Sequence, residues 1–230
     1  GSQARRQAAQ KRAEDGKNET PINKAWFTSC LAEILGENTV LLNELGVDVS
    51  QIEFNHPGTF FGTPPSAALG WALGASLGAK LAAPDRPAVS VCADGAVFMQ
   101  ANVLGTAVEY DIPAVWVVWN NHAYASIRGL QRGYLENREL ATDFHHPETG
   151  EPYTPDFAAM ARSAGVEGVR IDKPGDLGDA IQTGIASGKP YLIDAHIGGD
   201  LNPPGAGVWE LPGIGINSPA IGERYDPDHS

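Results

Sequence analysis

Two short apolar runs and the segment between them constrain the fold of this chain more than any other feature. The first run covers residues 89–93 and ends at Asp94, and the second covers residues 114–119 and ends at Asn120. Short continuous runs rich in β-branched residues are typical of strands buried on both faces of a parallel sheet. Between them, residues 99–110 place apolar side chains on one helical face, at Val103, Leu104, Ala107 and Val108. Because parallel strands need a crossover connection, the pattern predicts a strand–helix–strand unit.

The rest of the chain repeats this alternation. We expect further strands in the apolar runs at residues 39–43, 169–171 and 190–197. Helical spacing of apolar residues predicts helices at residues 21–35, 67–81, 155–165 and 176–187. Ser66 is a candidate N-cap, Gly36 and Gly188 are candidate stops, and residues 54–66 are too rich in Gly and Pro for a regular element. The order predicts an α/β fold: a doubly wound, mostly parallel sheet with helices on both faces.

The polar residues that follow the two central strands are the first candidates for a functional site. Asp94 and Asn121 are 27 positions apart, and the carboxyl ends of neighbouring parallel strands meet at the edge where α/β sheets bind ligands. Carboxylate and amide oxygens suit a hard cation such as Mg²⁺. Taken separately, Asp-Gly and Asn-Asn are ordinary turn signals. Their combination at this spacing predicts a site for a cation and an anionic cofactor.

This stretch resembles the cofactor motif of the thiamine diphosphate-dependent enzymes, in which Gly-Asp-Gly is followed some two dozen residues later by Asn-Asn. The resemblance implies that Mg²⁺ is bound by Asp94, by the Asn121 side chain and by the carbonyl of Ala123, and that the ion holds the cofactor diphosphate. The motif departs from the family at two positions, because Ala93 and Ala125 stand where glycine is usual. Neither change removes a ligand.

Backbone amides on both sides of the motif are the expected contacts of the diphosphate. Gly95 and Ala96 come just before the expected N-terminus of the crossover helix, where free N–H groups favour a phosphate. Tyr124 and Ala125 are expected to supply amides from the other side. Together with the three metal ligands, these residues form the predicted cofactor site.

Leu69 is the candidate catalytic residue of the small-residue helix that follows residues 54–66. In acetolactate-synthase-like enzymes, which this segment resembles, a bulky apolar residue before a glycine holds the cofactor in a bent conformation, so that the aminopyrimidine reaches the thiazolium C2. Leu69 precedes Gly70 and falls at this position. The alternative is an ordinary core leucine. Recurrence of glycine along one helix face, at Gly70, Gly74 and Gly78, predicts close approach of a neighbouring backbone.

Three other titratable residues follow expected strands or lie in loops, and the sequence indicates no chemical role for them. Glu44 follows an expected strand, but a solvated loop glutamate is the commoner case. His145 and His146 lie in the irregular polar stretch at residues 131–152, where a long loop is usually functional or mobile. A proton donor near neutral pH is one interpretation of this pair; an exposed loop pair is the other.

Net charge, cysteine content and the length of the apolar runs exclude several kinds of partner and location. A net charge of −12 argues against nucleic acid and anionic membrane partners. Cys30 and Cys92 lack metal-type spacing and are expected to be reduced core residues of a cytoplasmic protein. No apolar run is long enough to span a bilayer, and the N-terminus lacks the apolar segment of a signal peptide.

The expected organisation has three parts: a polar N-terminal tail or linker at residues 1–20, a cofactor domain at residues 21–197, and an extended C-terminal arm at residues 198–230. The resemblance covers only the diphosphate-binding domain of the family. It implies a partner, either a subunit or a missing domain, that binds the pyrimidine and carries the activating glutamate. Self-association into dimers or tetramers is also expected.

These observations predict a thiamine diphosphate- and Mg²⁺-binding subunit or domain of an enzyme that cleaves, forms or decarboxylates C–C bonds next to a carbonyl. The resemblance is to acetolactate synthase and 2-hydroxyacyl-CoA lyase, with a 2-oxo acid, aldehyde or acyl-CoA as substrate; the exact substrate does not follow from the sequence. Alternatives are a 2-oxo acid decarboxylase component and a non-catalytic assembly subunit. A nicotinamide-dependent dehydrogenase lacks its Gly-x-Gly-x-x-Gly motif here, and a magnesium-dependent phosphatase does not explain Asn120-Asn121.

Overall fold

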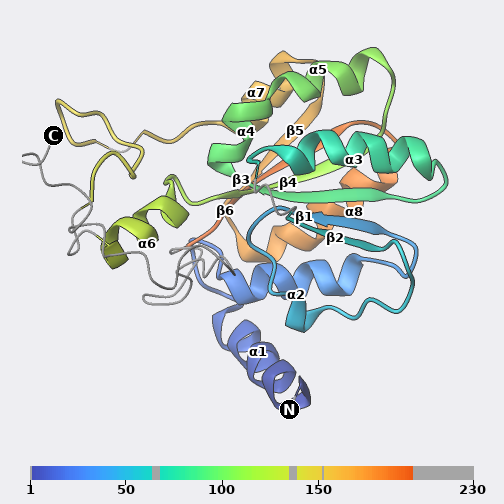
Figure 1. The fold of residues 1–230 in the computed structure, drawn as a ribbon, viewed down its shortest axis with the longest axis horizontal. Coiled ribbons are helices and arrows are strands. Elements are labelled where there is room, and N and C mark those ends of the chain that lie inside the picture. The colour runs from blue at the N-terminus through green and yellow to red at the C-terminus, as the bar shows by residue number, and fades with distance from the viewer. Residues whose placement is uncertain (1, 64–67, 135–138, 152, 199–230) are drawn as a thin grey trace, which may run out of the picture. The chain divides into compact units, whose positions relative to one another are not determined.

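A computed structural model describes residues 2–63, 68–134, 139–151 and 153–198 of the chain. Within these residues a parallel sheet of six strands lies between helices on its two faces (Figure 1). The strands are β1 (Val40–Asn43), β2 (Phe60–Gly62), β3 (Ala88–Ala93), β4 (Ala114–Asn120), β5 (Glu167–Ile171) and β6 (Tyr191–His196). Their order is β2-β1-β3-β4-β6-β5, and every neighbouring pair is parallel. The predicted doubly wound α/β fold is confirmed.

The helices form two layers. The layer above the sheet in Figure 1 contains α3 (Trp71–Ala82), α4 (Asp94–Gln100), α5 (Asn102–Glu109) and α7 (Phe157–Ser163). The opposite layer contains α2 (Lys24–Ile34) and α8 (Leu177–Ser187), and α1 (Ser2–Gly16) packs against α2. Short 3-10 turns form at η1 (Val49–Gln51) and η2 (Pro174–Asp176).

The central strand β4 has side chains buried on both faces of the sheet. Trp116 and Val118 join the apolar core under α3, α4, α5 and α7, and the Trp116 indole N–H donates to Ser76 Oγ at 3.0 Å. On the other face, the Trp119 ring lies edge-on to Phe27 of α2, with 5.0 Å between ring centroids. Burial on both faces explains the unbroken apolar run that the sequence shows here.

Several predicted elements have different boundaries in the structure. The crossover expected at residues 99–110 is two helices, α4 and α5, which meet at Ala101, and α4 already begins at Asp94. The small-residue helix begins at Trp71 with Gly70 as its N-cap, while Ser66 lies outside the described residues. The stretch at residues 54–66 contains the edge strand β2, which was not predicted.

Of the three glycines predicted to allow close approach of a neighbouring backbone, only Gly70, the N-cap of α3, does so. A Cβ added to Gly70, which has φ +87°, would lie 2.1 Å from Gln100 Cγ and 3.1 Å from the Ala96 carbonyl oxygen. At Gly74 the nearest atom would be 3.9 Å away, and at Gly78 nothing lies within 4 Å among the described residues. Close backbone approach therefore applies to Gly70 alone.

The N-terminal segment is a helix with a packed side. Ala9 and Ala13 of α1 are buried, so the polar tail predicted for residues 1–20 is not fully solvated. Cys30 and Cys92 are buried free thiols, as predicted. In the described part of the chain, no helix has both the length and the apolar character needed to cross a membrane.

The described residues separate into two compact units, residues 2–123 with 144–198, and residues 124–143. The first unit contains the sheet and the helices on both its faces. The second contains α6 (Ala125–Tyr134), so part of the stretch predicted to be irregular after residue 131 is helical. The C-terminal arm predicted at residues 198–230 lies outside the described residues except for Gly198.

Candidate functional site

Asp94 occupies the point where the two central strands end side by side. It follows β3 directly and is the first residue of α4, and its carboxylate is 1% exposed. Oδ1 accepts the Gly95 N–H at 2.7 Å, and Oδ2 accepts the Asn121 and Ala123 N–H groups at 3.2 and 3.3 Å. The structure thus brings Asp94 and Asn121 together, as the strand pattern predicted, and places Ala123 beside them.

The electrostatics of this carboxylate suit a cation. Burial raises the pKa of Asp94 to about 6, and the backbone N–H groups of Gly95, Ala123 and Asn121 oppose that rise. Among the described residues, no Lys, Arg or His forms an ion pair with Asp94. A buried carboxylate that is held by neutral donors keeps a negative charge for which a cation would compensate.

The other predicted ligands are compatible with a magnesium ion. The Asn121 Oδ1 atom is buried, and Ala123 is 3% exposed. Oxygens of a carboxylate, a carboxamide and a main-chain carbonyl form the hard ligand set that Mg²⁺ prefers. Among described residues, no three His, Cys, Asp or Glu side chains gather as a metal site, but the predicted set contains only one such side chain. The residues present therefore fit the ion.

The expected diphosphate contacts fall in both units. Gly95 and Ala96 are buried in the first turn of α4, and the Gly95 N–H is already bonded to Asp94. Tyr124 and Ala125 begin the second unit, where the Tyr124 N–H donates to the Thr142 carbonyl at 2.7 Å and Ala125 is the first residue of α6. The proposed role of all four amides stays a prediction.

Leu69 is 40% exposed and is not a core residue. It precedes Gly70, whose backbone packs closely on Ala96 and Gln100 of α4. The alternative of an ordinary core leucine is therefore wrong for this structure. Leu69 lies in a turn beside the helix that begins with Asp94, which leaves its predicted contact with a cofactor open.

Glu44 is a buried structural acid, so the interpretation as a solvated loop residue is wrong. It follows β1 and is 2% exposed. Its carboxylate accepts the Gly70 N–H at 2.7 Å and the Ala72 N–H at 3.1 Å, and burial raises its pKa. Glu44 thus binds the free amides at the start of α3 and fixes the turn that carries Leu69.

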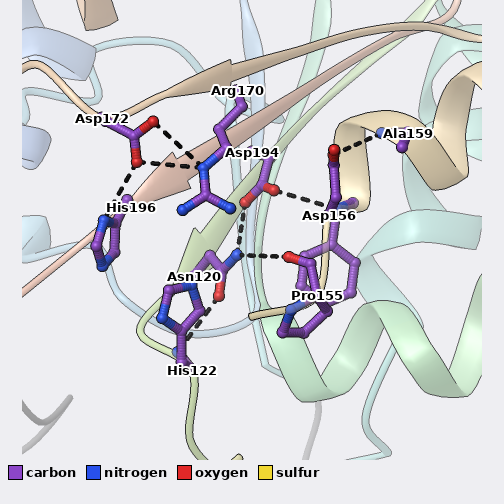
Figure 2. Close-up of polar contacts among 10 residues, drawn as sticks. Asn120, His122, Pro155, Asp156, Ala159, Arg170, Asp172, Asp194 and His196 are labelled. Atoms are coloured by element: carbon purple, nitrogen blue, oxygen red, sulfur yellow. Dashed lines mark hydrogen bonds and ion pairs between the residues drawn. The ribbon is translucent and has the colours of Figure 1, made fainter. Parts of the chain in front are cut away.

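A second buried polar group, which sequence reasoning missed, lies beside His122 of the loop that carries the predicted ligands Asn121 and Ala123 (Figure 2). Asn120 ends β4 and Asp194 lies in β6, and both side chains are fully buried. Asn120 Nδ2 donates to Asp194 Oδ1 at 2.8 Å, while Asn120 Oδ1 accepts the His122 N–H at 3.3 Å. The other Asp194 oxygen accepts the Phe157 N–H at 3.1 Å. An aspartate within an apolar strand run was the signal that could have found it.

The histidines divide into two groups. His145 and His146 are exposed, as one of the two interpretations held. His122 stacks on His196, with 4.7 Å between ring centroids, and His196 Nδ1 lies 3.3 Å from Asp172 Oδ1. Burial lowers the pKa of His122 to about 4, with the charges of His196 and Arg170 contributing. His122 is therefore neutral at pH 7 and adds no positive charge beside the predicted metal ligands.

Comparison with known proteins identifies the family of this domain. Residues 45–195 match the family described as thiamine pyrophosphate enzyme, C-terminal TPP binding domain; thiamine pyrophosphate is another name for thiamine diphosphate. A probable acetolactate synthase large subunit from Methanocaldococcus jannaschii is 29% identical over 192 residues, which cover 78% of this chain and 31% of that protein. A sulfoacetaldehyde acetyltransferase from Alcaligenes xylosoxydans xylosoxydans is 33% identical over 159 residues, which cover 67% of this chain and 25% of that protein.

A solved structure gives the same result. The thiamine diphosphate-dependent 4-hydroxybenzoylformate decarboxylase of Rhodococcus jostii RHA1 is similar with a TM-score of 0.70 at 26% sequence identity, over 79% of this chain and 33% of that one. The chain thus spans about a third or less of the length of these relatives. Its parallel sheet and these matches agree: the chain belongs to the thiamine pyrophosphate enzymes and contains their C-terminal cofactor-binding domain.

Proposed function

We propose that this chain holds the diphosphate of thiamine diphosphate through a magnesium ion, as the diphosphate-binding half of an enzyme that acts on bonds next to a carbonyl. One observation carries the proposal. The buried Asp94 carboxylate joins the ends of β3 and β4 by accepting the N–H groups of Asn121 and Ala123, and no cationic side chain among the described residues pairs with it.

Each residue of the site has a distinct role in this proposal. Asp94 is the charged metal ligand, the Asn121 side chain and the Ala123 carbonyl complete the protein's share of the coordination, and Mg²⁺ keeps its other positions for phosphate and water. Gly95, Ala96, Tyr124 and Ala125 offer backbone amides to the phosphates. Leu69 supports the cofactor's bent conformation, and its exposed side chain beside α4 is compatible with that role.

The bound cofactor supplies the carbanion chemistry, while the protein binds, orients and tunes it. Glu44 and His122, two titratable residues of the described part of the chain, are poor candidates for acid–base chemistry. Both oxygens of the buried Glu44 carboxylate accept backbone N–H groups, and His122 is neutral at pH 7 because burial lowers its pKa. We therefore assign the activating glutamate to a pyrimidine-binding domain, either on a separate subunit or elsewhere in a longer chain.

Such an enzyme would bring the two domains together by association, in dimers or tetramers. The relatives that carry the names acetolactate synthase large subunit, sulfoacetaldehyde acetyltransferase and benzoylformate decarboxylase support a small 2-oxo acid or aldehyde as the substrate class. A 2-hydroxyacyl-CoA lyase remains part of the proposal, since it shares the same cofactor chemistry. A non-catalytic assembly subunit is the alternative function.

Calorimetric titration with thiamine diphosphate tests the proposal most directly. We expect saturable binding in the presence of Mg²⁺, and strongly weakened binding when the metal is removed with a chelator. Thiamine, which lacks the diphosphate, is the matched control ligand and is expected not to bind measurably. Equal affinities with and without Mg²⁺ would contradict the metal-mediated site, and no binding under either condition would favour the assembly subunit.

A further inference from the structure

The loop at residues 121–123 carries two of the three proposed metal ligands. Its three backbone N–H groups donate to two buried side chains, Asp94 and Asn120. The N–H groups of Asn121 and Ala123 donate to Asp94 Oδ2. The N–H of His122, which lies between them, donates to Asn120 Oδ1 at 3.3 Å, although it also contributes to the stabilisation of the Asp94 carboxylate. Asn120 Oδ1 is thus the acceptor that the loop uses in addition to Asp94.

The backbone conformation of His122 makes its hydrogen bond to Asn120 Oδ1 important. Its φ of +55° lies in the left-handed region, which a residue with a side chain adopts at a cost. The local hydrogen bond from its N–H to the Asn120 side chain, two residues earlier, helps to offset that cost. The acceptor is a carboxamide oxygen, and a carboxamide can be turned over to present a donor instead. Something must therefore fix the orientation of Asn120.

Asp194 supplies the shorter of the two contacts that fix the orientation of Asn120, because Asn120 Nδ2 donates to Asp194 Oδ1 at 2.8 Å and to the Pro155 carbonyl at 3.5 Å. An ionised carboxylate only accepts hydrogen bonds, so the Asn120 group that faces Asp194 Oδ1 at 2.8 Å is Nδ2. The Asn120 oxygen must then face the His122 N–H (Figure 2). Asp194 itself is held in place because its second oxygen accepts the N–H of Phe157, the first residue of α7. Both side chains are fully buried, so water does not substitute for these contacts readily.

We infer that Asp194 is a positioning residue: through the carboxamide of Asn120 it fixes the 121–123 loop and thereby the Asn121 and Ala123 ligands. The inference rests on the proposed metal site. Asp194 touches neither the ion nor the cofactor in this arrangement, and it acts through Asn120 alone.

The test compares Asp194→Asn with Asp156→Ala. The asparagine has nearly the same shape, but its amide can present a donor to Asn120, which leaves only the longer 3.5 Å contact with the Pro155 carbonyl to orient the Asn120 side chain. Asp156 is the matched control, because its exposed side chain caps the same helix α7 by accepting the Ala159 N–H at 2.7 Å and has no contact with Asn120 among the described residues. The Asp156 variant therefore reports the effect of weakening α7 while both hydrogen bonds of Asp194 stay in place.

Two measurements are made on the folded chain. Calorimetry with Mg²⁺ at saturating thiamine diphosphate gives the metal affinity, and exchange of the His122 amide proton, followed by NMR without ligand, reports the loop directly. For Asp194→Asn we expect faster exchange at His122 and a roughly 10- to 100-fold loss of Mg²⁺ affinity, the usual effect of removing a residue that orients a metal ligand. Asp156→Ala should change neither. Wild-type exchange and affinity in Asp194→Asn, or an equal loss in Asp156→Ala, would overturn the inference.

A second variant covers the case in which Asp194→Asn does not fold. Asn120→Ala removes the acceptor for His122 and leaves Asp194 bonded to Phe157; it should show the same faster exchange and weaker Mg²⁺ binding, and wild-type behaviour would overturn the inference. In the double variant, Asp194→Asn should cause no further loss of Mg²⁺ affinity, since Asp194 acts only through Asn120. If wild-type protein binds no Mg²⁺ with the cofactor, the proposed function fails, whereas His122 exchange still tests the positioning role.

Discussion

Removing the Glu44 carboxylate is expected to destabilise the domain measurably and to loosen the turn that carries Leu69. Glu44 accepts the N–H groups of Gly70 and Ala72 at 2.7 and 3.1 Å and is 2% exposed. In Glu44→Ala both amides lose their acceptor. These amides lie at the start of α3, where no residue of the helix can bind them. The carboxylate is thus the helix cap, supplied from the end of β1.

The magnitude follows from the burial of these groups. Each buried donor left without a partner costs about 1–3 kcal/mol, and loss of a helix cap typically costs about 0.5–2 kcal/mol. Release of the buried charge and entry of water into the vacated space offset part of this sum. We therefore expect Glu44→Ala to lower the free energy of unfolding by roughly 2–4 kcal/mol. Glu44→Gln keeps the volume and one acceptor oxygen, and its loss should be about half as large.

Urea unfolding of the three proteins at several pH values provides the assay. Burial raises the pKa of Glu44, so the free energy that this group contributes through protonation is fully present below the unfolded pKa of about 4.3 and is lost as the pH rises through the folded pKa. The stability difference between wild type and Glu44→Gln should therefore shrink as the pH rises from 4 to 7. A difference below about 0.5 kcal/mol for Glu44→Ala, the range of ordinary surface changes, would refute the capping role.

Three further predictions concern the proposed site. Asp94→Ala should abolish Mg²⁺-dependent cofactor binding in calorimetry, while the far-UV circular dichroism spectrum stays unchanged. The control variant Asp179→Ala, at an exposed position of α8, should bind the cofactor normally. Wild-type affinity in the Asp94 variant would contradict the assignment of Asp94 as the metal ligand. Leu69→Ala should keep diphosphate binding but slow hydrogen–deuterium exchange at the cofactor C2 in the reconstituted enzyme, with the exposed Leu81→Ala as control; an unchanged rate would show that Leu69 does not touch the cofactor. The chain alone, at verified cofactor saturation, should neither decarboxylate nor ligate 2-oxo acids, because a positioned acid–base group is commonly worth about 10²–10⁴-fold in rate; turnover by the chain alone would direct attention back to Glu44 and His145.

The fold was predictable where the sequence pattern is set by burial. β3, β4 and β6 are apolar runs because helices cover both faces of the sheet, and their adjacency in the sheet is what brings Asp94 and Asn121 together. The start of α4 was not predictable in the same way. It begins directly at Asp94 after Ala93, which gives no side-chain cap, so the sequence carries no start signal there.

The hydrogen bonds of Glu44 and Asp194, which fix the backbone around the site, could not be predicted because their partners are distant in the sequence. Glu44 bonds to amides 26 and 28 positions away, and Asp194 bonds to Asn120 across 74 positions. A glutamate after a strand is usually solvated, and only the packing of α3 over β1 turns Glu44 into a cap. Likewise, Asp194 gains its role only when β6 pairs with β4.

Three acidic side chains are buried among the residues that the structure describes, and the difference among them explains why we place the metal at only one. Glu44, Asp94 and Asp194 are each satisfied by neutral N–H donors. Such donors stabilise a carboxylate without cancelling its charge. At Glu44 and Asp194 the donors fix a helix start and a neighbouring carboxamide, which are structural tasks. At Asp94 the donors belong to the loop whose own oxygens, from Asn121 and Ala123, are additional ligands. A cation there would compensate a buried charge and gain further ligands at the same time, which neither of the other two acids offers.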